Sequence, residues 1–97
     1  MNKAIQYLAL LILSPLLITT ALAVPIEPNA QIYKSLVGEK AVLNAMASMI
    51  KANGYKCDSI SAAIPFSFST GYTVTCNNYA YTYEIADKGG NWVVTLK

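Results

Sequence analysis

The sequence predicts a small α+β domain, in which one N-terminal helix packs on a four-stranded antiparallel meander sheet that carries one disulfide. Apolar residues recur every three or four positions from about residue 33 to 53, which is typical of a helix with one buried face. From residue 55 onward, β-branched and aromatic residues alternate with polar ones between turn residues, which is typical of strands. Two cysteines, Cys57 and Cys76, lie in this second half.

The first 23 residues have the composition of a secretory signal peptide. Lys3 precedes an apolar run over residues 7–18, and Ala21 and Ala23 form an A-x-A cleavage pattern. The run of about 12 residues is shorter than the roughly 20 that cross a bilayer, and Pro15 interrupts it. We therefore expect cleavage after Ala23, a periplasmic or secreted product, and no stable membrane anchor after cleavage.

The remaining 74 residues form one domain near the lower size limit for an independent core. Residues 24–33 contain two prolines and are expected to be an extended leader, and residues 34–97 are expected to be the folded domain. This part of the chain has six lysines, no arginine and five acidic residues, which is a net charge of +1. The lysines are scattered, whereas nucleic-acid binding needs a clustered basic surface, so no nucleic-acid partner is expected.

The predicted helix has a clear end and an uncertain start. Gly54 follows Asn53 and provides the left-handed residue that commonly ends a helix. Asn29 or Ser35 could cap the start, and Gly38 weakens the first turns. The apolar stripe contains Leu36, Leu43, Met46, Ala47 and Ile50.

Two turns set the register of the predicted strands. A two-residue turn at Asn77-Asn78 would pair Cys76 with Tyr79, and a four-residue turn over residues 87–90 would pair Ile85 with Trp92. Directly paired residues share a face of the sheet, so both turns select the same apolar face. That face contains Tyr72, Val74, Cys76, Tyr79, Tyr81, Tyr83, Ile85, Trp92, Val94 and Leu96. The opposite face contains Thr73, Thr75, Thr82, Glu84, Asn91, Val93 and Thr95.

The first predicted strand, over about residues 55–63, fits this pattern less well. If Cys57 faces the core, Ile60 and Ile64 point away from it unless a bulge shifts the alternation. Cys57 and Cys76 are expected to form a structural disulfide in an oxidising compartment. Their spacing is not the C-x-x-C of a redox pair, and the chain has no histidine and no third cysteine to complete a zinc site.

The sequence offers few groups for catalysis, and we expect neither a catalytic residue nor a cofactor or metal. Without histidine there is no ordinary base that titrates near neutral pH. The acidic residues are spread along the chain and include no pair with an evident shared cleft. They are Glu27, Glu39, Asp58, Glu84 and Asp87.

Three features are candidates for binding. The tyrosines and Trp92 of the apolar face would form the core beneath the helix or, alternatively, an aromatic surface for a ligand. Phe66 and Phe68 lie in a loop and are possible partner contacts or ordinary loop packing. The last strand, over residues 91–97, has a free edge that could accept a strand from a partner or, alternatively, is blunted by Lys97 and the chain end.

Four segments, GYKCDSIS over residues 54–61, GYTVTCN over 71–77, YEI over 83–85 and GGNWVV over 89–94, resemble short exported bacterial proteins of unknown function. The resemblance implies a small periplasmic domain with a disulfide and carries no activity or ligand. The expected function is therefore that of a non-catalytic protein-binding module, such as an inhibitor, an accessory subunit or an envelope factor. The alternative is a small-ligand or glycan binder that uses exposed aromatic side chains.

Overall fold

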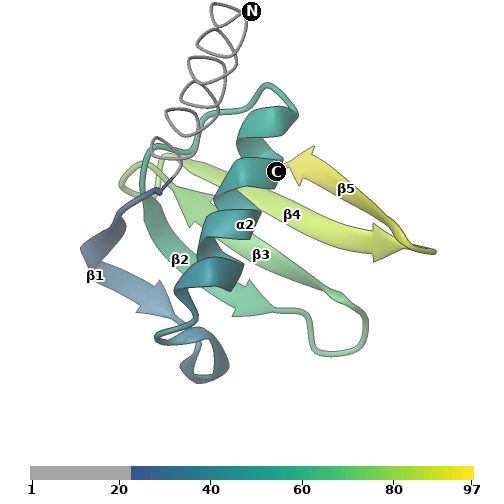
Figure 1. The fold of residues 1–97 in the computed structure, drawn as a ribbon, viewed down its shortest axis with the longest axis horizontal. Helices are drawn as coiled ribbons and strands as arrows, with labels where there is room; N and C mark the ends of the chain where they lie inside the picture. The colour runs from purple at the N-terminus through teal and green to yellow at the C-terminus, as the bar shows by residue number, and fades with distance from the viewer. Residues whose placement is uncertain (1–22) are drawn as a thin grey trace, which may run out of the picture.

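The computed structural model describes residues 23–97, and the predicted signal peptide lies almost entirely outside the described residues. No helix in the described part of the chain is long and apolar enough to cross a membrane. One long helix packs against one face of a sheet (Figure 1). In chain order the elements are β1 (Ile26–Ile32), the 3-10 helix η2 (Lys34–Leu36), α2 (Lys40–Ala52), β2 (Ile60–Pro65), β3 (Gly71–Cys76), β4 (Tyr81–Lys88) and β5 (Asn91–Leu96).

The sheet has five strands in the order β1-β2-β3-β4-β5, so the prediction of four strands was wrong. The additional strand, β1, comes from the segment expected to be an extended leader, and it pairs with β2 in parallel. The other neighbouring pairs are antiparallel as predicted. β1, α2 and β2 together form a β-α-β unit, because two parallel neighbours need a crossover connection.

Strand β1 is irregular along its length. Ile26 pairs with Ile60 and Gln31 pairs with Ala62, so five steps along β1 correspond to two steps along β2. The intervening residues of β1 therefore protrude from the sheet. Pro28 lies in this protrusion and is tolerated because β1 is an edge strand, where one missing N–H need not break a ladder.

The helix begins later than its periodicity predicted. Gly38, with a φ of +83°, separates η2 from α2, and Glu39 occupies the N-cap position without a side-chain hydrogen bond. The end is confirmed: Asn53 is the C-cap and Gly54 has a φ of +85°. The buried residues of α2 are Leu43, Met46, Ala47 and Ile50, and Leu36 of η2 is buried beside them.

Both hairpins differ in register from the prediction by two residues. Cys76 pairs with Tyr81 across a four-residue turn, and Lys88 pairs with Asn91 across the two-residue turn Gly89-Gly90. Both glycines have positive φ, as a type I′ hairpin turn requires. A shift of two residues keeps the strand residues on their predicted faces, because side chains alternate with a period of two. Tyr79 is the exception: it was predicted on the apolar face, but it lies in the turn before β4 and is 46% exposed.

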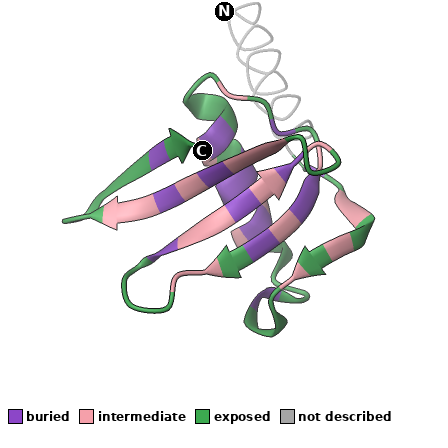
Figure 2. Ribbon diagram, turned by 180° about the vertical axis from the view of Figure 1, so that it is seen from behind, coloured by how far each residue is buried: buried purple, intermediate pink, exposed green. Residues whose placement is uncertain are grey.

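The predicted apolar face is confirmed as the face that α2 covers, although its outer members are not core residues. Figure 2 shows the buried bands along the strands, with α2 behind the sheet. Trp92 is 43% exposed and Leu96 is 47% exposed, because the corrected register places Trp92 opposite Asp87 near the end of the hairpin. Trp92 stacks there on Tyr72, with ring centroids 6.4 Å apart. The fully covered residues are Val74, Cys76, Tyr83 and Ile85, with Val94 nearly so.

The bulge that the first predicted strand required is present in β2. Ile60 pairs with Cys76 while Ala62 pairs with Thr75, and this irregularity buries both Ile60 and Ser61. Ile64 points away and is exposed. The threonine-rich face is confirmed as the opposite face, where the hydroxyls of Thr75 and Thr82 are 3.3 Å apart.

The predicted disulfide is confirmed. Cys57 and Cys76 are bonded, their Cα atoms are 5.1 Å apart, and both residues are fully buried. The bond joins the segment before β2 to the end of β3, and it lies in the same core cluster as Tyr83 and Ile60.

Replacing Cys57 and Cys76 together by Ser is expected to lower the free energy of unfolding by about 2–5 kcal/mol, because the unfolded chain gains conformational freedom without the cross-link. Urea unfolding under oxidising conditions measures this change. The wild-type protein in excess reductant is the control, and it separates loss of the bond from the effect of two buried hydroxyls. An unchanged midpoint for the double variant would contradict the expected contribution.

Candidate functional site

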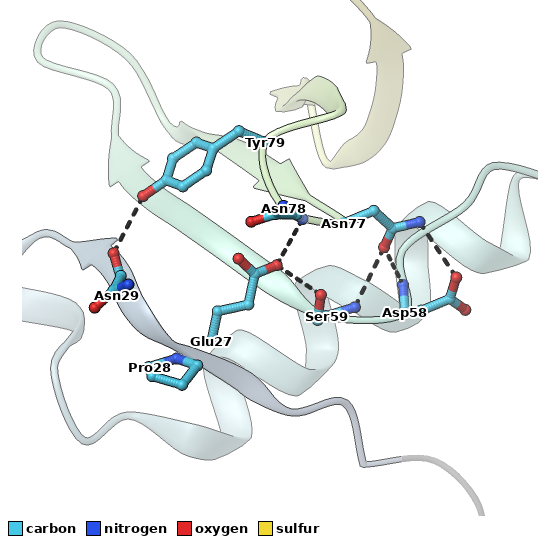
Figure 3. A pocket seen from close by; sticks show the side chains of 8 residues that line it. All are labelled: Glu27, Pro28, Asn29, Asp58, Ser59, Asn77, Asn78 and Tyr79. Atoms are coloured by element: carbon cyan, nitrogen blue, oxygen red, sulfur yellow. Dashed lines mark hydrogen bonds between the residues drawn. The ribbon is translucent and has the colours of Figure 1, made fainter.

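An open pocket of about 560 Å³ lies between the protruding part of β1 and the turn that joins β3 to β4 (Figure 3). Three segments that are distant in sequence form its walls. β1 provides the first wall, the residues before β2 provide the second, and the β3–β4 turn provides the third. The lining residues are Glu27, Pro28, Asn29, Asp58, Ser59, Asn77, Asn78 and Tyr79.

Glu27 is at the centre of this site. Its Oε2 atom accepts hydrogen bonds from Ser59 Oγ at 2.6 Å, Ser61 Oγ at 2.7 Å and the backbone N–H of Asn78 at 2.8 Å. These bonds favour the charged carboxylate, so they lower the pKa of Glu27, with Ser59 contributing most and partial burial opposing the effect. The ionised side chain thereby connects β1 to β2 and to the β3–β4 turn.

The turn over residues 77–79 has an unusual backbone. Asn77, Asn78 and Tyr79 have φ values of 58°, 56° and 64°, which is the left-handed region. Asparagine tolerates this region, whereas it is strained for a bulky residue such as Tyr79. Each N–H of the turn has an acceptor: Ser59 O for Asn77, Glu27 for Asn78, and Ser61 Oγ at 2.9 Å for Tyr79. The neighbouring segments therefore hold the turn in this conformation.

The side chain of Asn77 makes a second connection between the walls. Its Oδ1 accepts hydrogen bonds from the backbone N–H groups of Asp58 at 2.7 Å and Ser59 at 3.3 Å. Its Nδ2 donates to Asp58 Oδ2 at 3.2 Å. Because Asn77 follows Cys76 and Asp58 follows Cys57, these bonds lie next to the disulfide, and the two walls are cross-linked twice.

The remaining polar groups of the pocket face solvent. Asp58, Asn29 and Asn78 are exposed, and Tyr79 is 46% exposed with its hydroxyl donating to Asn29 O at 3.3 Å. This set offers one carboxylate, two side-chain amides and the face of one aromatic ring. Such groups bind polar ligands by hydrogen bonding and by stacking.

The geometry of Glu27 suits a structural role more than proton transfer. A lowered pKa makes the carboxylate a weak base at neutral pH, and Oε2 is already occupied by three donors. Within residues 23–97, no group of three or more histidine, cysteine, aspartate or glutamate side chains is arranged to hold a metal ion.

The two phenylalanines predicted as partner contacts lie in the β2–β3 loop, at the end of these strands away from the pocket. Phe66 is half-buried, and its ring occupies the space where a side chain at Gly71 would be, 2.5 Å from the position of a Cβ atom. Phe68 is fully exposed. The structure therefore separates them: Phe66 packs on the backbone at Gly71, and Phe68 is open to contact.

Sequence reasoning missed the hydrogen-bonded cluster of Glu27, Ser59 and Ser61. Glu27 is more than thirty residues from the serines, and no motif marks the three residues as partners. They meet only because β1 pairs with β2 in parallel and β2 has a bulge at Ser61.

Comparison with known proteins found no matching family model, no matching curated protein and no matching solved structure.

Replacing Glu27 by Gln is expected to destabilise the protein at neutral pH, because the amide is a weaker acceptor for Ser59, Ser61 and the Asn78 N–H. Since the pKa of Glu27 is lowered in the folded state, its contribution is present above the ordinary value of 4.5 and is lost as pH falls through the folded pKa. The difference in urea midpoint between the variant and the wild type should therefore shrink as pH falls.

Glu84→Gln is the matched control. Glu84 forms an exposed ion pair with Lys97 at 3.4 Å, and such pairs contribute about 0–1 kcal/mol. If Glu27→Gln were no more destabilising than Glu84→Gln at neutral pH, the connecting role of Glu27 would be refuted.

Proposed function

We propose that this protein is a non-catalytic exported module that binds a protein partner, such as a target of inhibition, a larger assembly or an envelope component, along the free edge of β5. The observation that supports the proposal is an edge strand with unpaired backbone groups beside exposed apolar side chains. In residues 23–97, no strand lies on the outer side of β5. Exposed edges of this kind bind extended segments of other chains by strand addition.

The register shows which backbone groups are free. Antiparallel pairs alternate between hydrogen-bonded and non-hydrogen-bonded positions, and the N–H of Lys97 donates to Thr82 O at 2.9 Å. Every second residue of β5, counting back from Lys97, therefore points its peptide groups toward β4. The N–H and C=O groups of Trp92, Val94 and Leu96 consequently point outward.

The side chains beside this edge are suited to an apolar segment. Trp92 and Leu96 are exposed on the face that carries α2, and Val93 is exposed on the other face. Phe68 is also fully exposed, in the β2–β3 loop, where Thr70 O accepts a hydrogen bond from Asp87 N of β4. A bound strand would cover several of these side chains.

The other edge of the sheet is less suitable. β1 has an irregular register, contains Pro28 and is connected to its neighbours through Glu27. Prolines and bulges are the features by which natural proteins block pairing at an edge. The cross-linked walls of the pocket thus lie beside the blocked edge, and the apolar surface lies beside the free one.

The disulfide supports a location outside the cytoplasm. Disulfides persist in oxidising compartments such as the periplasm and the extracellular medium, and the Cys57–Cys76 bond is fully buried. A periplasmic or secreted location agrees with the predicted signal peptide and is part of the proposal.

Replacing Leu96 by Pro should abolish strand addition, because it removes an outward N–H without removing a bond to β4. Leu96→Ala is the matched control, since it shortens the same side chain and keeps the N–H. The probe is a library of displayed peptides selected on the exported protein. We expect extended apolar peptides whose binding is lost with Leu96→Pro and only weakened with Leu96→Ala. Binders that tolerate Leu96→Pro would contradict the proposal.

A second candidate function, the binding of a small polar ligand or glycan, is favoured by one observation. Tyr79 presents a half-exposed ring in a pocket with Asn29, Asp58 and Asn78. Soluble N-acetylhexosamine oligomers should then shift the NMR signals of the pocket residues, and Tyr79→Ala should remove the shifts. Tyr33→Ala is the control because Tyr33 is equally exposed away from the pocket. Unchanged spectra with the wild type would exclude this candidate for these sugars.

A further inference from the structure

We infer that the partner fitted by the β5 edge is a second copy of this chain, paired with the first through antiparallel β5 strands around a two-fold axis. The inference rests on the proposed function, because it uses the same edge. The partner is identified by the residues along that edge, which are complementary to themselves when the strand is turned by 180°. A two-fold interface must be self-complementary, since each residue contacts a symmetry-related position on the same surface.

The outward backbone groups of β5 are arranged symmetrically about Val94. If Val94 pairs with Val94 of the second copy, then Trp92 pairs with Leu96 of that copy and Leu96 pairs with its Trp92. The backbone N–H and C=O groups of all three residues point away from β4, so each of the three pairs is a hydrogen-bonded pair. An antiparallel ladder of this length provides about six backbone hydrogen bonds.

The exposed side chains are complementary in the same register. Trp92 is 43% exposed and Leu96 is 47% exposed, and both are on the α2 side of the sheet. The two-fold axis places each Trp92 directly opposite a Leu96, and both members of the pair become covered. Aromatic and aliphatic side chains that face each other across two strands stabilise their pairing. On the other face, Val93 is opposite Thr95 of the second copy.

The charges along β5 do not oppose this arrangement. β5 has no charged residue between Asn91 and Leu96, and Lys97 would be opposite Asn91 of the second copy. The ammonium group of Lys97 is also 3.4 Å from Glu84 of its own chain. Edges that natural proteins protect from pairing usually carry lysine, proline or a bulge, and the register of β5 with β4 is regular.

The size of the edge sets the strength of the pairing. A six-residue strand contributes a contact well below the roughly 1,200–2,000 Å² of total buried surface that is typical of stable complexes. The dimer should therefore depend on protein concentration, with monomer dominant in dilute solution. Pairing would also cover Trp92, so its fluorescence should change with concentration.

Hydrogen exchange measured by NMR over a concentration series tests the inference on the exported protein. In the monomer, the amides of Asn91, Val93 and Thr95 are bonded to β4, and those of Trp92, Val94 and Leu96 are exposed. With rising concentration, the second set should become protected while the first set changes little. Analytical ultracentrifugation of the same samples should show conversion from one chain to two.

Two variants give a matched comparison. Leu96→Pro removes one outward N–H from each copy, so two hydrogen bonds are lost and the dissociation constant of the dimer should rise by roughly tenfold or more. Leu96→Ala keeps these bonds and should weaken the dimer less. Circular dichroism on both variants in dilute solution checks that the monomer is still folded.

A separate variant tests the register. Val94→Cys should form a disulfide between two copies, because a directly opposed hydrogen-bonded pair has Cα atoms about 5.5 Å apart, within the range that a disulfide spans. Thr95→Cys is the control, since its symmetry mate is displaced along the strand by two residues. Equal cross-linking of the two variants would overturn the register.

The outcomes separate the inference from the proposed function. A protein that stays monomeric at all concentrations, or a dimer that leaves the Trp92, Val94 and Leu96 amides unprotected, overturns pairing of two copies. If displayed peptides nevertheless bind in a manner that Leu96→Pro abolishes, the proposed function stands with a different partner. If Leu96→Pro affects neither dimer nor peptide binding, both are overturned.

Discussion

The position of β1 depends on the carboxylate of Glu27. A single oxygen atom accepts hydrogen bonds from Ser59, Ser61 and the N–H of Asn78, and thereby joins an edge strand, a central strand and a turn. The ladder between β1 and β2 is interrupted, so regular pairing alone gives β1 few connections to the sheet. The charged oxygen also satisfies a backbone N–H in a turn with three successive left-handed residues. The same carboxylate therefore supports both the irregular edge strand and the walls of the pocket.

The two edges of the sheet have different surroundings. Near β1, the disulfide and the side chain of Asn77 cross-link two of the segments that surround the pocket, and the exposed groups there are amides and a carboxylate. At the opposite edge, β5 pairs with β4 in a regular register and carries exposed apolar side chains. Binding sites need rigid support to avoid the entropic cost of ordering, and a short sheet with one covalent cross-link supplies it. This division supports the proposal that β5 is the surface for a macromolecule, and it keeps the pocket as the candidate site for a small polar ligand.

Local pattern was enough to predict which face of the sheet is buried, but it could not give the register. The prediction placed each hairpin two residues from its observed pairing, and the alternation of side chains made the faces correct despite this error. Strand β1 could not be predicted, because Ile26–Ile32 reads IEPNAQI, with one proline and several polar residues where alternation is expected. β1 pairs with β2 in parallel, and this pairing forms only when α2 crosses over the sheet between the two strands, so no local turn signals it. The site could not be predicted for the same reason, since Glu27 meets Ser61 only after β1 is in place.

The two edges of the sheet show how one chain can block pairing on one side and permit it on the other. At β1, a proline, a protrusion and a charged residue all lie within seven residues, and each of them disfavours a further strand. At β5, no charge or proline occurs between Asn91 and Leu96, and the outward positions carry Trp92, Val94 and Leu96. An exposed apolar edge without such blocks is a site at which uncontrolled association can begin. A selected partner that covers it removes this hazard, and because β5 is short, the association can remain reversible. The physical chemistry of the edge thus argues for a binding role in which one specific strand, and not any strand, completes the sheet.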